Sequence, residues 1–203
     1  MAGERKLVKA CVAVIVLAVT PALRAATIWT TGPGDVTFNK PSNSDETDPA
    51  FWDKITNSTW ITRGNTKGLY NAKTETFFND VVDPAVSPAN TEWAFSGLEG
   101  NPTFGYGDGA AQYLGLTFDL WEDSLGGTGS LASNIQTLPG VLHIISDDIY
   151  IDIQFSFWQQ HPGGGFTYLR AAAPTATPEP GSLAILVLGA GVLGLKGRAG
   201  RRR

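Results

Sequence analysis

Carboxylates are the most numerous side chains in this chain that could carry out chemistry. Nine of them lie in three groups along its middle part: Asp45, Glu46, Asp48 and Asp53; Glu122 and Asp123; and Asp147, Asp148 and Asp152. A glycosidase needs two carboxyl groups about 5–10 Å apart across a sugar ring. Because sequence spacing does not specify such a separation, a polysaccharide-active enzyme is only the third function that we consider.

One of these groups also has the composition of a calcium loop. Asp45, Glu46 and Asp48 lie in a segment that is rich in Asn, Ser and Thr, and Ca²⁺ prefers such hard oxygen ligands in a flexible loop. The segment has neither EF-hand spacing nor a Gly-rich nonapeptide repeat, so a solvated acidic loop is the alternative that we favour. Apart from calcium at these three residues, we expect no cofactor.

Other reactive side chains are scarce. The histidines are His143, in an apolar stretch, and His161, before a Gly-rich loop, and the single cysteine is Cys11. We therefore expect structural roles for both histidines and no zinc site. The sequence also contains neither a GxSxG nucleophile elbow nor a GxxxxGK phosphate-binding loop. We predict that the protein is not an enzyme.

The elements that position these side chains are predicted to be β-strands. Apolar and polar residues alternate over residues 149–158, which places Ile149, Ile151, Ile153, Phe155 and Phe157 on one face. Only a half-buried strand collects such a set on a single face. The apolar, β-branched residues 141–145 and the turn-forming residues 146–148 precede it, so the two segments predict an antiparallel hairpin.

Two large aromatic residues are expected on the other face of that strand. Tyr150 and Trp158 lie an even number of positions from the polar residues Asp152 and Gln154, which places all four on the same face of the strand. We therefore expect both rings to point outward. There they could form a glycan-binding platform, as in a carbohydrate-binding module. The alternative is that they are core or covering residues, which is the commoner use of large aromatic side chains in β-proteins.

Further short strands predict the fold class. Strand-like residues separated by Gly, Pro, Asn and Asp occur at 27–30, 36–38, 59–62, 68–70, 92–95, 113–121 and 166–169. Such spacing is typical of an antiparallel sandwich or a jelly roll. We therefore predict one all-β domain over residues 27–170, with a short helix around residues 74–79.

Both ends of the chain differ from this domain. Residues 1–26 have a basic start, an apolar run over residues 10–23 and small residues at Ala25 and Ala26, which is the pattern of a secretory signal peptide. Residues 171–180 form an Ala/Pro/Thr-rich linker. Residues 181–203 contain a thirteen-residue apolar run at 183–195, followed by basic residues at Lys196, Arg198, Arg201, Arg202 and Arg203.

This C-terminal order predicts a short transmembrane helix whose basic end stays inside the cell. Thirteen residues at ~1.5 Å each reach only about 20 Å, which is less than the ~30 Å hydrocarbon core, so the anchor is expected to be marginal. Charge separates the parts further: residues 27–170 hold six basic and 17 acidic residues, a formal charge of −11. Such a domain is expected to repel nucleic acid.

The C-terminal segment resembles the PEP-CTERM sorting signal of bacterial surface proteins, because Pro178, Glu179 and Pro180 precede the apolar run and the arginine cluster. The resemblance implies recognition of this motif by an exosortase, a membrane-spanning transpeptidase, after export by the general secretory machinery. The central residues, with Trp60-Ile61-Thr62-Arg63-Gly64 and Gly163-Gly164-Gly165-Phe166-Thr167-Tyr168, are similar to uncharacterised exported proteins with the same tail.

These features predict an exported protein of the cell envelope, outer surface or extracellular space, held transiently by its C-terminal helix. The first hypothesis is a non-enzymatic protein of the cell surface or exopolysaccharide matrix. A carbohydrate-binding module is the second, and extracellular polysaccharide is the partner that it implies. The ligand of residues 27–170 stays open at this point.

Overall fold

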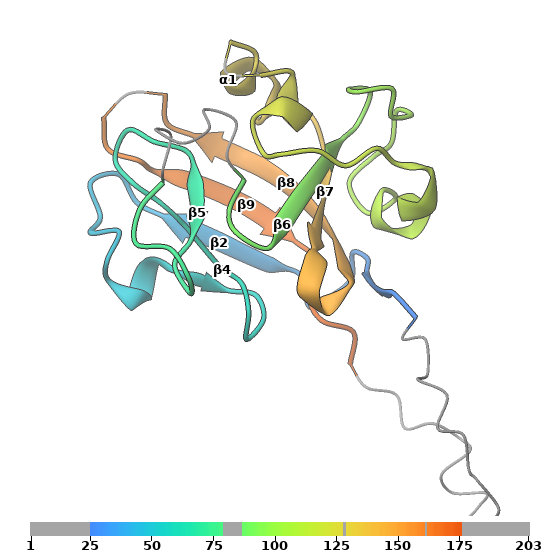
Figure 1. The fold of residues 1–203 in the computed structure, drawn as a ribbon, viewed down its shortest axis with the longest axis horizontal. Coiled ribbons are helices and arrows are strands. Elements are labelled where there is room, and N and C mark those ends of the chain that lie inside the picture. Colours follow the sequence, from blue (N-terminus) through green and yellow to red (C-terminus); the bar gives the residue numbers. More distant parts are fainter. Residues whose placement is uncertain (1–24, 79–86, 128, 161, 176–203) are drawn as a thin grey trace, which may run out of the picture.

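The computed structural model describes residues 25–78, 87–127, 129–160 and 162–175, and its strands form two sheets (Figure 1). The larger sheet contains five antiparallel strands in the spatial order β2 (Val36–Lys40), β9 (Phe166–Arg170), β8 (Ile149–Trp158), β7 (Gly140–Ile144) and β6 (Thr91–Phe95). Beside the first part of β8 lies the parallel strand β1 (Thr27–Trp29). The smaller antiparallel sheet contains β3 (Asp53–Lys54), β4 (Trp60–Arg63) and β5 (Leu69–Asn71).

Helical elements are short in the described residues. They are α1 (Leu131–Asn134) and the 3-10 turns η1 (Pro49–Phe51), η2 (Ala110–Gly115), η3 (Asp123–Leu125) and η4 (Ile145–Asp147). The predicted all-β class is therefore confirmed in its coarse form. None of these helices is long and apolar enough to cross a membrane. The apolar runs at 10–23 and 183–195 lie outside the described residues.

The two sheets share one core, and its centre is aromatic. Trp93, Phe95, Trp121 and Phe155 are fully buried, and the Trp93 and Trp121 ring centroids lie 4.8 Å apart in an edge-on arrangement. The small sheet adds Ile61 and Leu69 to the same cluster. Edge-to-face contacts between large rings add stabilisation beyond area burial, so this cluster can hold together a domain whose described residues contain no cysteine.

The predicted hairpin is confirmed, but the alternation in its second strand breaks near the end. Ile149, Ile151, Ile153 and Phe155 face the core as predicted, whereas one extra residue in β8 between Phe155 and Phe157 shifts the register against β9. A β-bulge of this kind reverses the side-chain faces that follow it. Phe157 is consequently exposed, and Trp158 is buried.

Two other predicted elements are wrong. Residues 113–121 are not a strand: they contain the end of η2, and then a single bridge joins Asp119 to Trp93. Their apolar residues Leu116 and Phe118 instead pack against a small second cluster formed by Phe104, Ala110 and Val141. The predicted helix at 74–79 is also absent from its described part, residues 74–78, which form a turn and bends.

The ends of the described chain lie at one pole of the domain. β1 pairs with the first residues of β8, and the segment after β9 returns to the same place, where Ala171 N–H donates to the carbonyl of Asp152. In Figure 1 the first and last coloured residues are accordingly side by side at lower right. At about 3.3 Å per residue, the ten-residue strand β8 ends roughly 30 Å from this pole.

Candidate functional site

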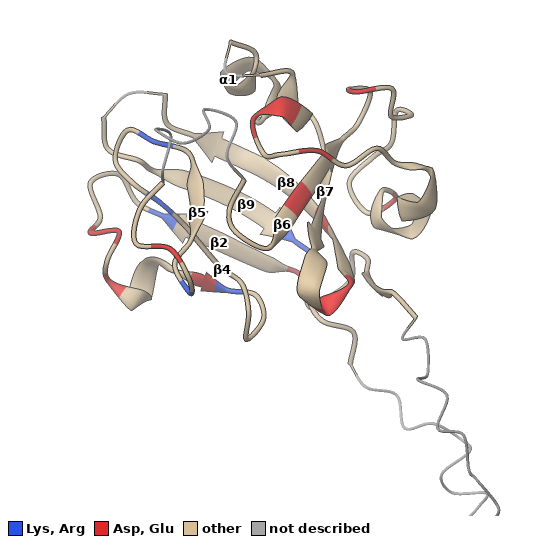
Figure 2. Ribbon diagram, viewed as in Figure 1, with Lys and Arg blue, Asp and Glu red and all other residues tan. Residues whose placement is uncertain are grey.

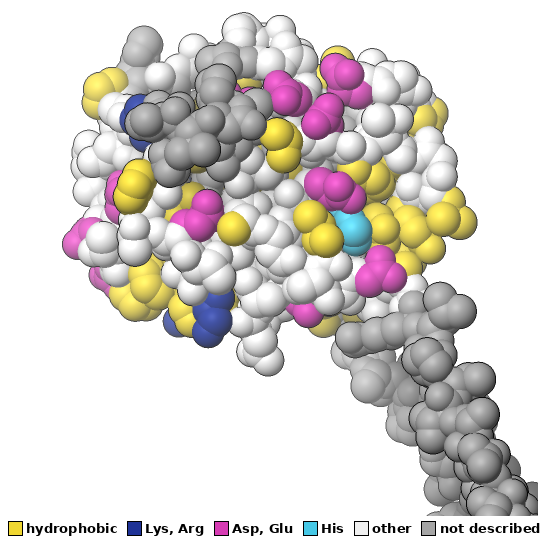
Figure 3. Space-filling view, in the orientation of Figure 1, with side chains coloured by type: hydrophobic (Ala, Val, Ile, Leu, Met, Phe, Trp, Pro, Cys, Tyr) yellow, Lys and Arg dark blue, Asp and Glu magenta, His cyan; other side chains and the backbone are white. Residues whose placement is uncertain are grey.

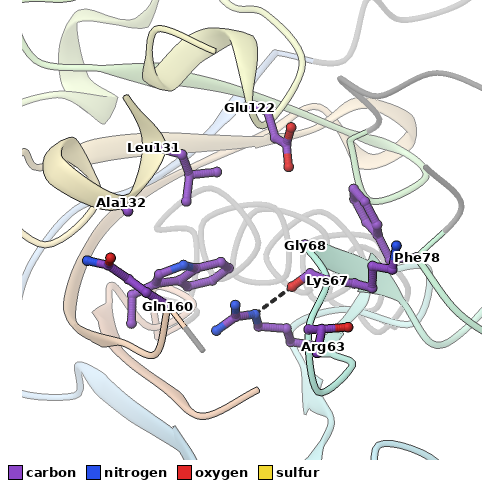
Figure 4. Close-up of a pocket in the computed structure, with 10 residues that line it drawn as sticks. Arg63, Lys67, Gly68, Phe78, Glu122, Leu131, Ala132 and Gln160 are labelled. Atoms are coloured by element: carbon purple, nitrogen blue, oxygen red, sulfur yellow. Dashed lines mark hydrogen bonds between the residues drawn. The ribbon is translucent and has the colours of Figure 1, made fainter. Parts of the chain in front are cut away.

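A cavity lies at the far end of β8, away from the pole that holds both ends of the described chain. Its volume is about 410 Å³. The small sheet, the segments before and after η3, and the end of β8 supply its lining residues Arg63, Thr66, Lys67, Gly68, Phe78, Glu122, Leu131, Ala132, Trp158 and Gln160 (Figure 4). Apolar walls and a few polar groups make it a candidate ligand site.

Arg63 and Trp158 form the floor of this cavity. The Arg63 guanidinium carbon lies 3.5 Å from the centre of the Trp158 ring, which is a close cation–π contact. Its Nε donates to the carbonyl of Lys67 at 2.6 Å, and its Nη1 donates to the carbonyl of Gly165 at 3.2 Å. Burial lowers the pKa of Arg63 to about 10, so the side chain stays cationic at neutral pH.

A glycine-rich loop brings these groups together. Gly164 has φ +59, and a Cβ there would lie 2.4 Å from the carbonyl oxygen of Gly64, so only glycine fits this approach. The neighbouring Gly163 N–H donates to the carbonyl of Asn65 at 2.9 Å. The loop after β8 is thereby fixed against the loop after β4, and the Arg63 guanidinium is held in place.

The rim of the cavity carries the remaining chemistry. Glu122 and Lys67 supply charges, Gln160 supplies an amide, and Phe78 and Leu131 supply apolar surface. In Figure 4 the Glu122 carboxylate and the Arg63 guanidinium lie on opposite sides of the space. A small ligand with hydroxyl groups and one apolar face matches this arrangement. Among the described residues that line the cavity, Glu122 is the only one with a carboxyl group, whereas a glycosidase needs two.

The two residues predicted as a glycan platform are not brought together. Trp158 is 6% exposed and belongs to the cavity floor, so the expectation that it points outward is wrong. Tyr150 lies on the other face of the sheet, where its ring centre is 4.0 Å from that of His143 and 4.1 Å from that of Tyr113. Both contacts use the faces of the Tyr150 ring, so the platform cannot form as predicted.

The predicted calcium ligands are engaged in local turns. Asp45 Oδ1 accepts the N–H and the hydroxyl of Thr47 at 2.9 and 2.7 Å, and these bonds lower the pKa of Asp45. Asp48 caps η1 through the N–H of Ala50. Glu46 lines a second cavity of about 230 Å³. The described residues contain no group of three or more His, Cys, Asp or Glu arranged to hold a metal ion.

The other carboxylates are dispersed, and two of them are buried. Asp53 bonds Arg170 and Tyr168 inside the core. Asp152 is 1% exposed, and burial raises its pKa to about 6, although the backbone N–H groups of Ala110 and Gly109 oppose this shift. A raised pKa is typical of a general acid, but Asp152 lines neither of the two cavities.

His143 is buried in β7. Its Nδ1 lies 2.7 Å from Glu92 Oε1, and its ring stacks on Tyr150. His161 lies outside the described residues. So do the sorting residues Pro178, Glu179 and Pro180 and the basic residues Lys196, Arg198, Arg201, Arg202 and Arg203.

The sequence prediction missed Arg63. The sequence did contain a sign of it. Arg63 is two positions after Ile61 in β4, so both side chains lie on the same face of the strand, and a cation on an apolar face is unusual. No family model, curated protein or solved structure matches this chain.

Proposed function

We propose that the protein is exported, caught at the membrane by its C-terminal segment, and acts outside the cell as a non-enzymatic binding domain of the cell surface or exopolysaccharide matrix. The observation that carries the proposal is the order of Pro178-Glu179-Pro180, apolar run and arginine cluster, together with the secretory pattern at residues 1–26. An exosortase-type transpeptidase is the expected processing partner.

The geometry of the described domain is consistent with such a tether. Both ends of the described chain lie at one pole, and the cavity with Arg63 and Trp158 lies about 30 Å away at the other. A domain held through residues 171–180 would therefore direct this cavity away from the membrane. The core that the two sheets share provides a rigid support for it.

Export and sorting are tested by fractionation and mass spectrometry of the native protein. We expect the mature chain outside the cytoplasm, without residues 1–26 and cut near Pro178-Glu179-Pro180. Deleting residues 181–203 should release the domain into the medium. A reporter fused after residue 170 that stays in the cytosol would contradict export, and an intact C-terminus in the mature protein would contradict processing.

Saccharide binding in the cavity is the second candidate function. The indole ring of Trp158, the Arg63 guanidinium, the Glu122 carboxylate and the Gln160 amide are groups that can bind a hydroxylated ligand. Trp158→Ala is an ambiguous test because it also removes a core ring, so rim variants are preferable. Glu122→Gln and Gln160→Ala should each weaken binding on a glycan array while the unfolding temperature stays unchanged. Full binding by the double variant would refute this site.

A further inference from the structure

A second aromatic surface lies on the small sheet, apart from the cavity at the end of β8. Trp52 precedes β3, and Trp60 begins β4 directly opposite Lys54. The two indole rings stack with centroids 5.7 Å apart and an interplanar angle of 22°. Both side chains are partly exposed. We call Trp52, Trp60, Lys54 and Lys73 the tryptophan–lysine surface.

The orientation of both rings is fixed by hydrogen bonds. The indole N–H of Trp52 donates to the carbonyl of Glu46 at 2.7 Å, and that of Trp60 donates to the carbonyl of Thr56 at 3.1 Å. The polar edge of each ring is therefore satisfied within the protein. What remains for a partner is the exposed part of the ring faces, which is apolar and carries negative quadrupole density.

Two lysines stand over these faces. The Lys73 ammonium is 4.5 Å from the Trp60 ring centre, and the Lys54 ammonium is 5.3 Å from Trp60 and 5.9 Å from Trp52. Within the described residues, neither forms an ion pair with a carboxylate. Figure 3 shows dark blue side chains beside yellow ones at the lower edge of this view of the molecule.

This gathering of cations is unusual for such an acidic domain. Among the lysines and arginines that the structure describes, Lys40, Arg63 and Arg170 are buried. Two of the three exposed ones, Lys54 and Lys73, belong to the tryptophan–lysine surface, whereas acidic residues are spread over the molecule (Figure 2). The surface thus has a local charge opposite to that of its surroundings, and charge complementarity selects an anionic partner.

The second cavity adjoins this surface through Trp52. It is lined by Glu46, Thr47, Trp52, Tyr70, Ala72, Glu75 and Thr76. Glu75 Oε2 is held by the N–H groups of Asn71 and Ala89 at 2.7 and 2.8 Å, so its position is fixed. Burial raises the pKa of Tyr70 to about 12, which keeps its phenol neutral. These carboxylates and hydroxyls can accept hydrogen bonds from the hydroxyl groups of a sugar.

We propose that the tryptophan–lysine surface binds an acidic polysaccharide of the uronic acid class. The carboxylate of one sugar pairs with the ammonium groups of Lys54 and Lys73, and the C–H face of that sugar contacts the part of the Trp52 and Trp60 rings that stays exposed. A lysine stem that merely shields an indole ring is the plain structural alternative. It predicts no preference for an anionic glycan.

The test compares polygalacturonate with the neutral polysaccharide dextran, using the full chain in detergent and affinity gel electrophoresis. We expect retardation by polygalacturonate alone, with affinity falling as NaCl is raised because exposed charges are screened. Lys54→Gln with Lys73→Gln should weaken binding at least tenfold. Trp60→Ala should do the same, and Trp60→Phe should restore part of the affinity. Unchanged unfolding temperatures exclude misfolding as the cause.

Three outcomes would overturn the proposal. They are equal retardation by dextran, full binding by the double lysine variant, and loss of binding with Lys67→Gln alone, which would move the anion to the cavity at the end of β8. Export and sorting do not depend on any of these outcomes, because fractionation measures them separately. Rim variants at Glu122 and Gln160 likewise report on the other cavity and not on Trp60.

Discussion

Asp53 and Asp152 are two buried carboxylates that lie on opposite faces of the large sheet and meet opposite conditions. Asp53 reaches from the small sheet to β9, where Arg170 binds both of its oxygens at 2.7 and 2.8 Å and the Tyr168 hydroxyl donates at 2.6 Å. Asp152 projects from β8 to the outer face. Its Oδ1 accepts the N–H of Ala110 at 2.8 Å, but its Oδ2 has no partner in the described residues.

The difference shows that burial alone does not determine whether a carboxyl group stabilises the fold; its hydrogen-bond and charge partners matter as well. Burial by itself would lower the pKa of Arg170, yet the hydrogen bonds and charge of Asp53 raise it, so the pair keeps both charges in the core. For Asp152 burial is the largest effect, and it raises the pKa to about 6. The ion pair of Asp53 with Arg170 thus joins the two sheets. Ionisation of Asp152, in contrast, destabilises the folded state, and it becomes more complete as pH rises.

The largest effect is expected when Asp53 is removed. Asp53→Ala leaves the Arg170 guanidinium buried without its carboxylate, and breaking a buried pair in this way costs about 3–5 kcal/mol. Urea unfolding followed by tryptophan fluorescence measures the loss. Replacing both partners, Asp53→Leu with Arg170→Met, should recover most of it because no unpaired charge remains. A loss below about 1 kcal/mol for Asp53→Ala would contradict an ion pair that joins the sheets.

Asp152→Asn should have a smaller effect that depends on pH. The unfolded carboxyl titrates near 3.8 and the folded one near 6, so the folded state binds more protons between these values. The free energy of unfolding therefore falls by about 2–3 kcal/mol as pH rises from 4 to 7. The asparagine variant lacks this drop, and its stability relative to the native protein should increase over the same window. Parallel pH profiles for the two proteins would refute the raised pKa.

The comparison also shows where sequence was sufficient. The β7–β8 hairpin and the described strands other than β3 follow from alternation and turn residues, because these are local properties, whereas the strand predicted at residues 113–121 does not form. The pairing of Asp53 with Arg170 joins residues 117 positions apart, and no local pattern specifies it. Arg170 does share a face with Phe166 and Tyr168 in β9, so a cation on an apolar face was a readable sign that a buried anion exists.

Trp158 shows why the cavity could not be predicted. Strict alternation in β8 would place Trp158 on the face of the sheet that Phe155 does not occupy. A single extra residue near Ser156 moves Trp158 to the same face as Phe155. Bulges depend on the pairing partner, which here is β9, and not on a composition that β8 carries itself. Trp52 and Trp60 were also missed as a surface, since their stacking requires β3 and β4 to pair in the observed register.

The smallest loss of unfolding free energy is expected for a variant that removes only one hydroxyl group from the Asp53 network. Tyr168→Phe deletes a hydrogen bond to Asp53 and keeps the ring in the core, so it should cost about 1–2 kcal/mol because the acceptor is charged and buried. Tyr106→Phe is the matched control. Its hydroxyl donates to Asp35 Oδ2 at 2.9 Å in a partly exposed position, where water can replace it, so the expected cost is at most about 0.5 kcal/mol. Equal losses in urea unfolding would mean that the network around Asp53 gains nothing from its burial.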